Sequence, residues 1–295
     1  MSAKKKSDQP AEPKSWYLVI DVALCEDCNN CFLACKDEHV DNDWPGYALS
    51  QPRHGHRWMN IGRKERGQYP IIDVAYRPTP CQHCENPPCR DKAENGAVVK
   101  REDGIVLIDP QKAAGQKALV SSCPYGAIFW NEEKNVPQKC TFCAHLIDSG
   151  WTKPRCVQSC PTGALTVHHL TQAEYQRLTA DKTLETLYPQ LETRPRVLYR
   201  NLHRFDKCFI AGSAAFMRDG KEECAQGVKA VLTGADGNVI AEAVTDSFGD
   251  FRLDKVPPDS GKCALYFSGS DFKDLTVDIE ITESAYAGVF HMETV

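Results

Sequence analysis

Cysteines at short, repeated spacings are the residues of this 295-residue sequence best suited to chemistry, and twelve of its fifteen lie between Cys25 and Cys160. The first four follow the pattern C-x2-C-x2-C-x3-C. In bacterial ferredoxins this pattern provides three thiolates to one iron–sulfur cubane and a fourth to a second cubane. The gaps are short because one tight loop must present successive thiolates to different corners of a small cube. The members of this group are Cys25, Cys28, Cys31 and Cys35.

A second group of four cysteines provides the matching set. It reads C-x2-C, then a twelve-residue insertion, then C-x3-C, and Pro161 follows its last cysteine as the ferredoxin pattern expects. Exchanging the fourth ligands between the two groups predicts two complete 4Fe-4S sites. Cluster 1 is then bound by Cys25, Cys28, Cys31 and Cys160, and cluster 2 by Cys35, Cys140, Cys143 and Cys156.

The four remaining cysteines of this region predict a third 4Fe-4S cluster. They form a C-x2-C-x4-C triple and a lone cysteine that is followed by Pro124. Because the fourth ligand of every site comes from a distant segment, metal binding should be coupled to folding. The ligands of cluster 3 are Cys81, Cys84, Cys89 and Cys123.

Two other uses of these cysteines suit the spacing less well. Zinc sites use C-x2-C pairs, but usually two pairs around one ion, and a run of four cysteines fits that arrangement poorly. A disulfide framework is typical of short secreted chains, whereas this chain is long and shows no secretory signal. The spacing therefore favours iron–sulfur clusters; a structural zinc protein, with zinc and no iron, is the alternative.

The composition is that of an ordinary globular protein, with 42% hydrophobic and 25% charged residues and a net charge of -5. This charge gives no indication of nucleic-acid binding. The length predicts about two domains. Residues 1–15 contain four lysines and two prolines without an apolar stretch, which predicts a disordered tail. No apolar run reaches the roughly twenty residues of a membrane span, so the cytoplasm is the expected location.

The elements that position the clusters are expected in residues 16–170, which contain a degenerate internal duplication. Each half begins with a short apolar stretch, Tyr17–Val22 or Ile71–Tyr76, followed by a cysteine loop. The stretches Pro124–Ala127 and Pro161–Ala164 align without gaps, and each follows a cysteine and precedes another apolar stretch. The pattern predicts an α+β fold with a duplicated ferredoxin-like iron–sulfur domain.

Two further segments carry local signals. Asp103–Asp109 predicts a hairpin turn and a strand. Residues 171–207 are expected to form a helical and extended connector. Thr171 with Glu174 is a capping-box signature, and recurring leucines suggest a helix through the segment before Pro195.

Residues 208–295 alternate with a period of two and predict a small antiparallel β-sandwich. Gly234–Gly237 and Asp246–Asp250 provide turn residues. The expected strands are Val228–Thr233, Val239–Thr245, Phe251–Leu253, Cys263–Phe267, Leu275–Thr282 and Gly288–Met292. The three cysteines left over are expected to be free thiols, since a disulfide between the first and last would need an oxidising compartment; they are Cys208, Cys224 and Cys263.

The cysteine motifs, in this order, resemble those of the iron–sulfur subunits of the dimethyl sulfoxide reductase family of molybdenum enzymes. Those subunits usually hold four clusters. In this sequence Ala93 stands where the second motif would have its last cysteine, and Ala113, Gln116 and Leu119 stand where the third motif would have three more. All four ligands of one cluster are absent together, so the resemblance implies the deletion of a whole site.

Several longer stretches resemble a narrower group, the small subunits of pyrogallol–phloroglucinol transhydroxylases and related resorcinol hydroxylases. The turn Thr245–Phe251 also resembles that of transthyretin-like or carboxypeptidase-regulatory-like sandwiches. The stretches that carry the first resemblance are Cys25–Cys31, Trp44–Tyr47, Gly55–Ile61, Arg101–Asp109 and Cys123–Gly126.

The resemblance implies a non-catalytic electron-transfer subunit. In that family a molybdenum ion held by two pyranopterin guanine dinucleotides lies in a large partner subunit, so a heterodimer, or a multiple of it, acting on a phenolic substrate is expected. An external redox carrier is a further expected partner. Cluster 1 would lie nearest the molybdenum and cluster 3 farthest. The alternatives are a subunit of another enzyme of that family and a free-standing polyferredoxin that serves several partners.

Two other features have open interpretations. His83 and His145 lie inside cysteine loops and could tune a cluster, although a surface position is favoured. The stretch Arg53–Arg66 could contact the large subunit, because Trp and Arg favour interface cores, or it could be a charged loop between motifs.

Overall fold

The computed structural model describes residues 12–180 and 182–295. Most of the expected tail, residues 1–11, lies outside the described residues. The chain divides into two compact units. The first comprises the residues up to Gly62 together with Arg77–Asn201, and the second comprises Arg63–Tyr76 together with Leu202–Val295.

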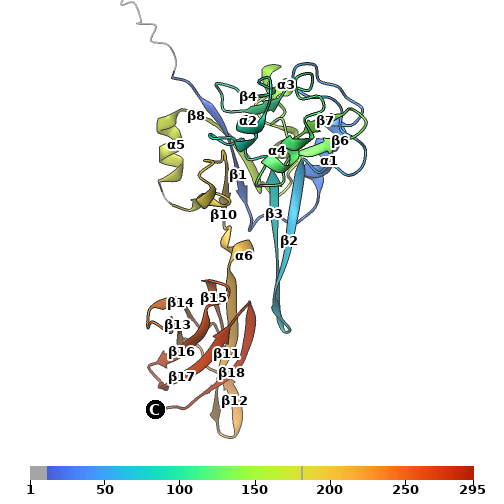
Figure 1. The fold of residues 1–295 in the computed structure, drawn as a ribbon. Helices are drawn as coiled ribbons and strands as arrows, with labels where there is room; N and C mark the ends of the chain where they lie inside the picture. The colour runs from blue at the N-terminus through green and yellow to red at the C-terminus, as the bar shows by residue number, and fades with distance from the viewer. Residues whose placement is uncertain (1–11, 181) are drawn as a thin grey trace, which may run out of the picture. The chain divides into compact units, whose positions relative to one another are not determined.

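A four-stranded sheet with the order β8-β1-β10-β9 forms the frame of the first unit (Figure 1). Its central strand, β1 (Ser15–Asp21), pairs antiparallel with β8 (Leu165–Leu170) and parallel with β10 (Val197–Arg200). Five consecutive residues of β1 are buried, as expected for an apolar strand between two neighbours that is covered on both faces. The edge strand β9 comprises Leu184–Glu185.

Two short hairpins and several single-turn helices carry the cysteine loops of the first unit. In the first hairpin β4 pairs antiparallel with β5, so the predicted turn and strand at Asp103–Asp109 are confirmed. The hairpin strands are β4 (Val98–Lys100), β5 (Val106–Ile108), β6 (Phe129–Asn131) and β7 (Val136–Gln138). The helices are α1 (Asn30–His39), α2 (Pro88–Lys92), the 3-10 helix η1 (Lys117–Ser122), α3 (Ala144–Asp148) and α4 (Arg155–Gln158).

The segment expected as a connector contributes two strands to the sheet of the first unit. The capping box at Thr171 is present and begins α5 (Gln172–Thr179). The predicted helix through to Pro195 is wrong, because α5 ends at Thr179 and is followed by β9 and the short 3-10 helix η2 (Pro189–Leu191). The recurring leucines beyond α5 therefore do not mark one helical face.

A long hairpin that the sequence did not predict joins β2 (Met59–Gln68) to β3 (Ile71–Pro80). Its outer part, Arg63–Tyr76, belongs to the second unit. There the Arg66 side chain donates to the carbonyl of Lys207 over 3.2 Å and forms an ion pair with Asp73. Four consecutive charged residues, Arg63–Arg66, interrupt the period-two pattern of β2. For this reason the sequence left two interpretations of Arg53–Arg66 open, a contact with the large subunit and a charged loop.

The second unit contains two four-stranded sheets that share one hydrophobic core (Figure 1). Both sheets contribute fully buried side chains to it, including Leu253 from β15 and Leu265 and Phe267 from β16. Helix α6 (His203–Asp206) precedes the first strand. One sheet consists of β11 (Cys208–Arg218), β12 (Lys221–Cys224), β15 (Asp250–Val256) and β18 (Ala285–Met292). The other consists of β13 (Lys229–Gly234), β14 (Val239–Val244), β16 (Gly261–Gly269) and β17 (Phe272–Ile281).

The expectation of a purely antiparallel arrangement is wrong at one place. Strand β18 pairs parallel with β11, whereas all other pairs in this unit are antiparallel. The parallel pair arises because the chain crosses from one sheet to the other between β17 and β18 instead of turning back in a hairpin. Strands β11 and β12 were not among the expected strands, although β11 pairs with all three other strands of its sheet.

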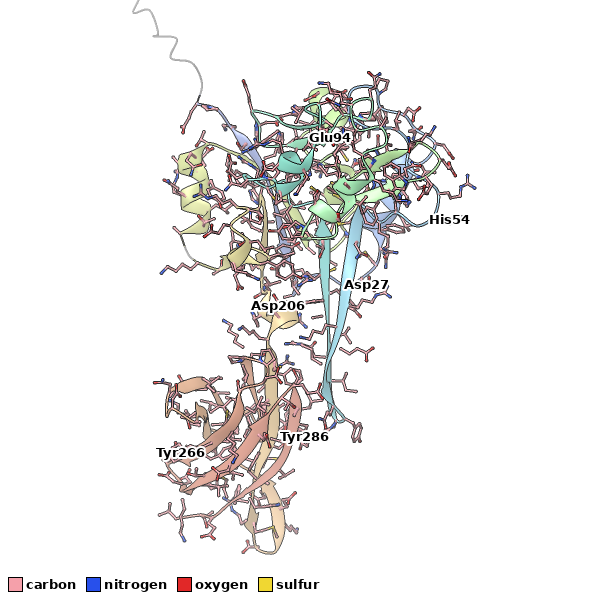
Figure 2. All side chains as sticks on the ribbon, in the orientation of Figure 1. Asp27, His54, Glu94, Asp206, Tyr266 and Tyr286 are labelled. Atoms are coloured by element: carbon pink, nitrogen blue, oxygen red, sulfur yellow. The ribbon has the colours of Figure 1, made fainter. Side chains whose placement is uncertain are left out.

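The three cysteines outside the predicted cluster region are free in the structure. Cys208 and Cys263 are buried in the core of the second unit, and Cys224 is exposed. In Figure 2, Tyr266 of β16 is labelled among the side chains of this unit, and its hydroxyl donates to Asp274 over 2.5 Å.

Candidate metal centres

The four cysteines predicted for cluster 1 line one cavity of the first unit. Three of them come from the loop before α1 and from its first turn. Cys160 comes from the end of the segment Cys140–Cys160, which is the fourth cysteine motif in the chain. Burial, together with the charges of Cys25, Cys160 and Cys28, raises the pKa of Cys31 to about 12. The four sulfurs therefore surround a common space although they are separated by up to 135 positions, the difference between 160 and 25.

The four cysteines predicted for cluster 2 line another cavity. Cys35 from α1 meets Cys140, Cys143 and Cys156 there. The rest of the wall is mainly apolar, and its members include Leu18, Trp58, Met59 and Phe142. Burial raises the pKa of Cys143 to about 12. Buried thiols of this kind stay protonated near neutral pH unless a metal takes the place of the proton.

The third set is brought together at the start of α2. Cys81, Cys84 and Cys89 are buried, and Cys123 is partly buried after η1. Burial, together with the charges of Cys81, Cys123 and Cys89, raises the pKa of Cys84 to about 12. These influences indicate that the lone cysteine lies beside the triple.

The cysteine loops share an unusual backbone feature. In each of three C-x2-C pairs the residue directly before the second cysteine is left-handed, with φ of 53° at Asp27, 43° at His83 and 59° at Phe142. A left-handed residue turns the chain sharply, so that successive side chains and N–H groups point to the inside of the loop. The amide of Phe142 lies 3.4 Å from Sγ of Cys140 in this way.

The three sets of thiols follow one another in space. Burial raises the pKa of Cys156 far above its usual range, and the charges that raise it further include Cys31 of the first set. Burial raises the pKa of Cys140 to about 11, with Cys81 of the third set adding to the effect. Cys81 also lines the cavity of the second set. The second set therefore lies between the other two.

The donor chemistry of these sites suits 4Fe-4S clusters. Each of the two cavities offers four thiols in an enclosed and mostly apolar space, which is the ligand set that such clusters require. A further amide, that of Ala127, lies 3.5 Å from Sγ of Cys123. In residues 12–180 and 182–295, no three His, Cys, Asp or Glu side chains are grouped closely enough to hold a single metal ion.

The four residues at which the resemblance implied an absent cluster take part in packing and hydrogen bonding. Ala113 and Leu119 are fully buried in one core, and Ala93 packs against it. Gln116 links the surrounding loops, because its side chain accepts from the amide of Glu94 over 3.0 Å and donates to the carbonyl of Lys112 over 2.8 Å. Glu94 is labelled in Figure 2 on the first unit. These positions therefore form a packed core with a bridging amide.

The surface position favoured for two histidines is wrong. His83 and His145 are buried, and so is His39, which the sequence analysis did not single out. His39 follows Cys35 by four residues on α1, so the two side chains share one helix face, and His39 lines the cavity of the second set. Burial, together with the nearby His145, lowers the pKa of His39 to about 3. The helical spacing from Cys35 was the available signal.

Part of the Arg53–Arg66 stretch belongs to the interior of the first unit. Trp58 is 2% exposed and lines the cavity of the second set. His56 is buried, with its Nε2 2.9 Å from the carbonyl of Trp130. Arg57 stacks over the ring of Phe32 at 4.1 Å from the ring centre. These residues support the loops that carry the cysteines.

None of the helices in the described part of the chain combines the length and the apolar composition needed to cross a membrane.

Comparison with protein families gives a match to the 4Fe-4S dicluster domain over residues 72–170. The pyrogallol hydroxytransferase small subunit of Pelobacter acidigallici is 47% identical over 90% of this chain and 95% of its own length. A tetrathionate reductase subunit of Salmonella typhimurium is 31% identical over 67% of this chain and 76% of its own length. The thiosulfate reductase electron transfer subunit of Salmonella typhi is 32% identical, over 61% and 87%.

Similarity to solved structures is weak. The minor pilin of Streptococcus agalactiae matches with a TM-score of 0.27 and 14% identity, over 52% of this chain and 76% of its own. The 5-hydroxyisourate hydrolase of Klebsiella pneumoniae matches with a TM-score of 0.23 and 17% identity, over 30% of this chain and 96% of its own. Matches at this level say nothing further about the fold.

Proposed function

Because the chain belongs to the iron–sulfur subunits of the dimethyl sulfoxide reductase family of molybdenum enzymes, we propose that it conducts electrons to or from a molybdenum site in a large partner subunit. When bound, each 4Fe-4S cluster accepts and passes on one electron. The residues of this chain hold the clusters at fixed positions and exclude water from them. No catalysis on substrate is assigned to this chain.

The chain holds three 4Fe-4S clusters in this proposal. The observation that carries it is that each of two enclosed cavities is lined by four thiols from two distant motifs. The crossing of the fourth ligands, Cys160 into the first cavity and Cys35 into the second, is the arrangement that the ferredoxin spacing requires. The proposed ligands are Cys25, Cys28, Cys31 and Cys160 for cluster 1, Cys35, Cys140, Cys143 and Cys156 for cluster 2, and Cys81, Cys84, Cys89 and Cys123 for cluster 3.

The clusters form a path in the order 1, 2, 3. Two pairs of neighbouring thiols support this order. Cys31 of cluster 1 lies near Cys156 of cluster 2, and Cys81 of cluster 3 lies near Cys140 of cluster 2. By the family resemblance, cluster 1 faces the molybdenum, so an external redox carrier would exchange electrons at cluster 3. A large open cavity lies beside this set, lined by Glu85, which follows Cys84, and by three tyrosines, Tyr17, Tyr175 and Tyr188.

The large partner subunit is proposed to hold molybdenum with two pyranopterin guanine dinucleotides and to form a heterodimer, or a multiple of it, with this chain. The name of the Pelobacter acidigallici relative indicates a polyhydroxybenzene substrate. A transhydroxylase moves a hydroxyl group between two phenols without net electron flow, whereas a hydroxylase or dehydroxylase needs electrons in every turnover. Whether the purified complex consumes or reduces an external carrier during each turnover distinguishes these activities.

The second unit is proposed to be a transthyretin-like sandwich that docks or stabilises the complex. Its two sheets and shared core support a sandwich, and the turn Thr245–Phe251 carries the resemblance. We propose that residues 16–170 carry the clusters, that residues 171–207 follow them and contribute β9 and β10 to the same unit, and that residues 208–295 form the β domain. A cytoplasmic location remains part of the proposal.

Purification under anaerobic conditions tests the assignment. The tagged chain should retain a large subunit at near-equal stoichiometry, and the complex should contain molybdenum as well as iron. A monomeric iron–sulfur protein without molybdenum would instead support a free-standing polyferredoxin. A preparation with zinc and no iron would support a structural zinc protein.

A further inference from the structure

A buried lysine lies at the start of the fourth cysteine motif of the first unit. Lys139 directly precedes Cys140 and is 3% exposed. Its ammonium group donates to the carbonyl of Cys140 over 3.1 Å and to the carbonyl of Val106 on β5. Both acceptors are backbone groups, so the side chain is held in place without any neighbouring acid.

The peptide of Val106 connects this lysine to the loop of the third set. The amide of Val106 donates to Nδ1 of His83 over 3.0 Å, and His83 lies between Cys81 and Cys84. The ring of His83 packs edge-on against Phe142, at 5.3 Å between ring centres, and Phe142 lies between Cys140 and Cys143. One buried network therefore joins the loops of the second and third sets, with the ammonium inside it.

The charge of Lys139 has no acidic partner among the described residues, in which every recorded contact of its ammonium is to a carbonyl. A buried cation without a counter-charge is strongly unfavourable, because removal from water is not compensated by neutral carbonyls alone. The fold therefore requires negative charge close to this site. A 4Fe-4S cluster with four thiolates is a net anion, and reduction makes it more negative.

We propose that Lys139 is the buried counter-charge shared by clusters 2 and 3, and that it holds the reduction potentials of both clusters above the values they would have without it. This inference rests on the proposed function, since it requires both clusters. Positive charge favours the reduced state because the added electron interacts with it in a low-dielectric interior. Lys139 acts by its position and carries no electron itself.

The contacts of Lys139 indicate which clusters feel its charge. Its ammonium donates to the carbonyl of Cys140, a proposed ligand of cluster 2. It also donates to the carbonyl of Val106, whose amide donates to His83 between two proposed ligands of cluster 3. Neither described contact of this ammonium is with a ligand of the first set, so cluster 1 is an internal reference.

The test is a redox titration of the anaerobically purified complex, followed by electron paramagnetic resonance, for the wild type, Lys139→Gln and Lys139→Arg. Signals are assigned to clusters with Cys25→Ser, Cys140→Ser and Cys89→Ser. In Lys139→Gln, the reduced-to-oxidised ratio of clusters 2 and 3 at a fixed potential should fall by about tenfold, which is 59 mV for a one-electron couple. Cluster 1 should keep its potential, and Lys139→Arg should stay close to the wild type.

Lys117→Gln is the matched control, because Lys117 is exposed and pairs with Glu132; it should shift no potential. Unchanged potentials in an iron-replete Lys139→Gln complex, or an equal shift of all three clusters, would overturn the inference while leaving the proposed function intact. If Lys139→Gln loses iron, the inference requires selective loss of clusters 2 and 3 with recovery in Lys139→Arg. Non-selective loss, or loss in both variants, would contradict it. A wild-type complex without clusters would refute both proposals.

Discussion

His145 and Glu38 lie 107 positions apart in the chain, and Nε2 of the histidine is 2.9 Å from Oε1 of the glutamate. Glu38 follows Cys35 on α1, and His145 follows Cys143 on α3. Arg155 on α4 binds the second carboxylate oxygen of Glu38 at 3.2 Å. This contact therefore fastens the helix of the first motif to the two helices of the fourth motif, beside the thiols proposed for cluster 2.

Removal of this carboxylate should loosen the second site. Glu38→Ala leaves His145 and Arg155 without their shared partner in a mostly buried place, which should destabilise the fold by about 1–3 kcal/mol. We expect a lower thermal unfolding midpoint and partial loss of iron, while Glu38→Gln, which keeps an acceptor, should lose less. Glu132→Ala is the control, because its pair with Lys117 is highly exposed and should contribute little. Equal effects of Glu38→Ala and Glu132→Ala would contradict this role.

Single cysteine substitutions should remove or degrade one cluster at a time, in the crossed pattern. Cys35→Ser should change the signal of the cluster bound by Cys140, although Cys35 lies in the first motif. Cys160→Ser should change the signal of the cluster bound by Cys25. Iron analysis and electron paramagnetic resonance measure both outcomes. Cys224→Ser, at an exposed thiol, should leave the iron content unchanged. If Cys35→Ser and Cys25→Ser affected the same cluster, the ligands would not be crossed.

Alanine substitutions at two glycines of the second unit should distinguish the cost of a left-handed backbone from the cost of steric overlap. Gly249 and Gly237 have nearly equal φ values of +77° and +78°, but a Cβ on Gly249 would lie 2.3 Å from the carbonyl oxygen of Ala214, and one on Gly237 would have no neighbour within 4 Å. Gly237→Ala should cost about 1 kcal/mol, through the left-handed backbone alone. Gly249→Ala should cost about 1–3 kcal/mol more, because the turn must move. Chemical unfolding of the full chain measures the free energy of unfolding of both variants. Equal losses of stability in the two variants would contradict the close packing of the turn at Gly249.

Acid should weaken the second unit through Asp73. Burial alone raises the pKa of Asp73, but hydrogen bonds from Arg66 and Arg252 and the charge of Arg204 lower it to about 2. In an unfolded chain the pKa of an aspartate is about 3.9. The folded state thus binds fewer protons in this range, so its stabilisation by Asp73 is full above about pH 4 and is lost as the pH falls towards about 2.

Hydrogen exchange of the β11 amides in the full chain, corrected for intrinsic rates, can follow this loss. The wild type should open progressively more often between about pH 4 and about pH 2, and Asp73→Asn should show a weaker dependence. Asp278→Asn, at an exposed carboxylate on β17, should keep the wild-type dependence. If the β11 amides of Asp73→Asn showed the same pH dependence of exchange as the wild type, other carboxylates would be responsible for the loss of stability in acid.

The cysteine spacing predicted the groups of thiols because it reflects a local requirement, namely how one loop reaches several corners of a cubane. The sequence placed Cys160 with Cys25, and both line one cavity. It could not establish that His39, His83 and Lys139 are buried, since burial depends on which distant segments cover them. Their places in the chain were the local signals: His83 lies inside a cysteine loop, Lys139 directly precedes Cys140, and His39 follows Cys35 by four residues on α1.

The strand predictions failed where contacts with distant segments, rather than the alternation of apolar and polar residues, decide the structure. Four consecutive charged residues in β2, Arg63–Arg66, concealed a long hairpin that the ion pair of Arg66 with Asp73 stabilises. The parallel pairing of β18 with β11 follows from a crossover between sheets, which no local pattern of residues 285–292 encodes. By contrast, the capping box of Thr171 and Glu174 is a contact within one helical turn, and it was correctly predicted.

The most direct test of the central claim is the metal content and redox behaviour of the anaerobically purified complex. About twelve irons per copy of this chain, with three separate one-electron reductions visible by electron paramagnetic resonance, are expected from three cubanes. Iron belonging to the large subunit should be subtracted after its separate purification. Far fewer irons on this chain, or zinc in their place, with no paramagnetic signal after reduction, would contradict the account.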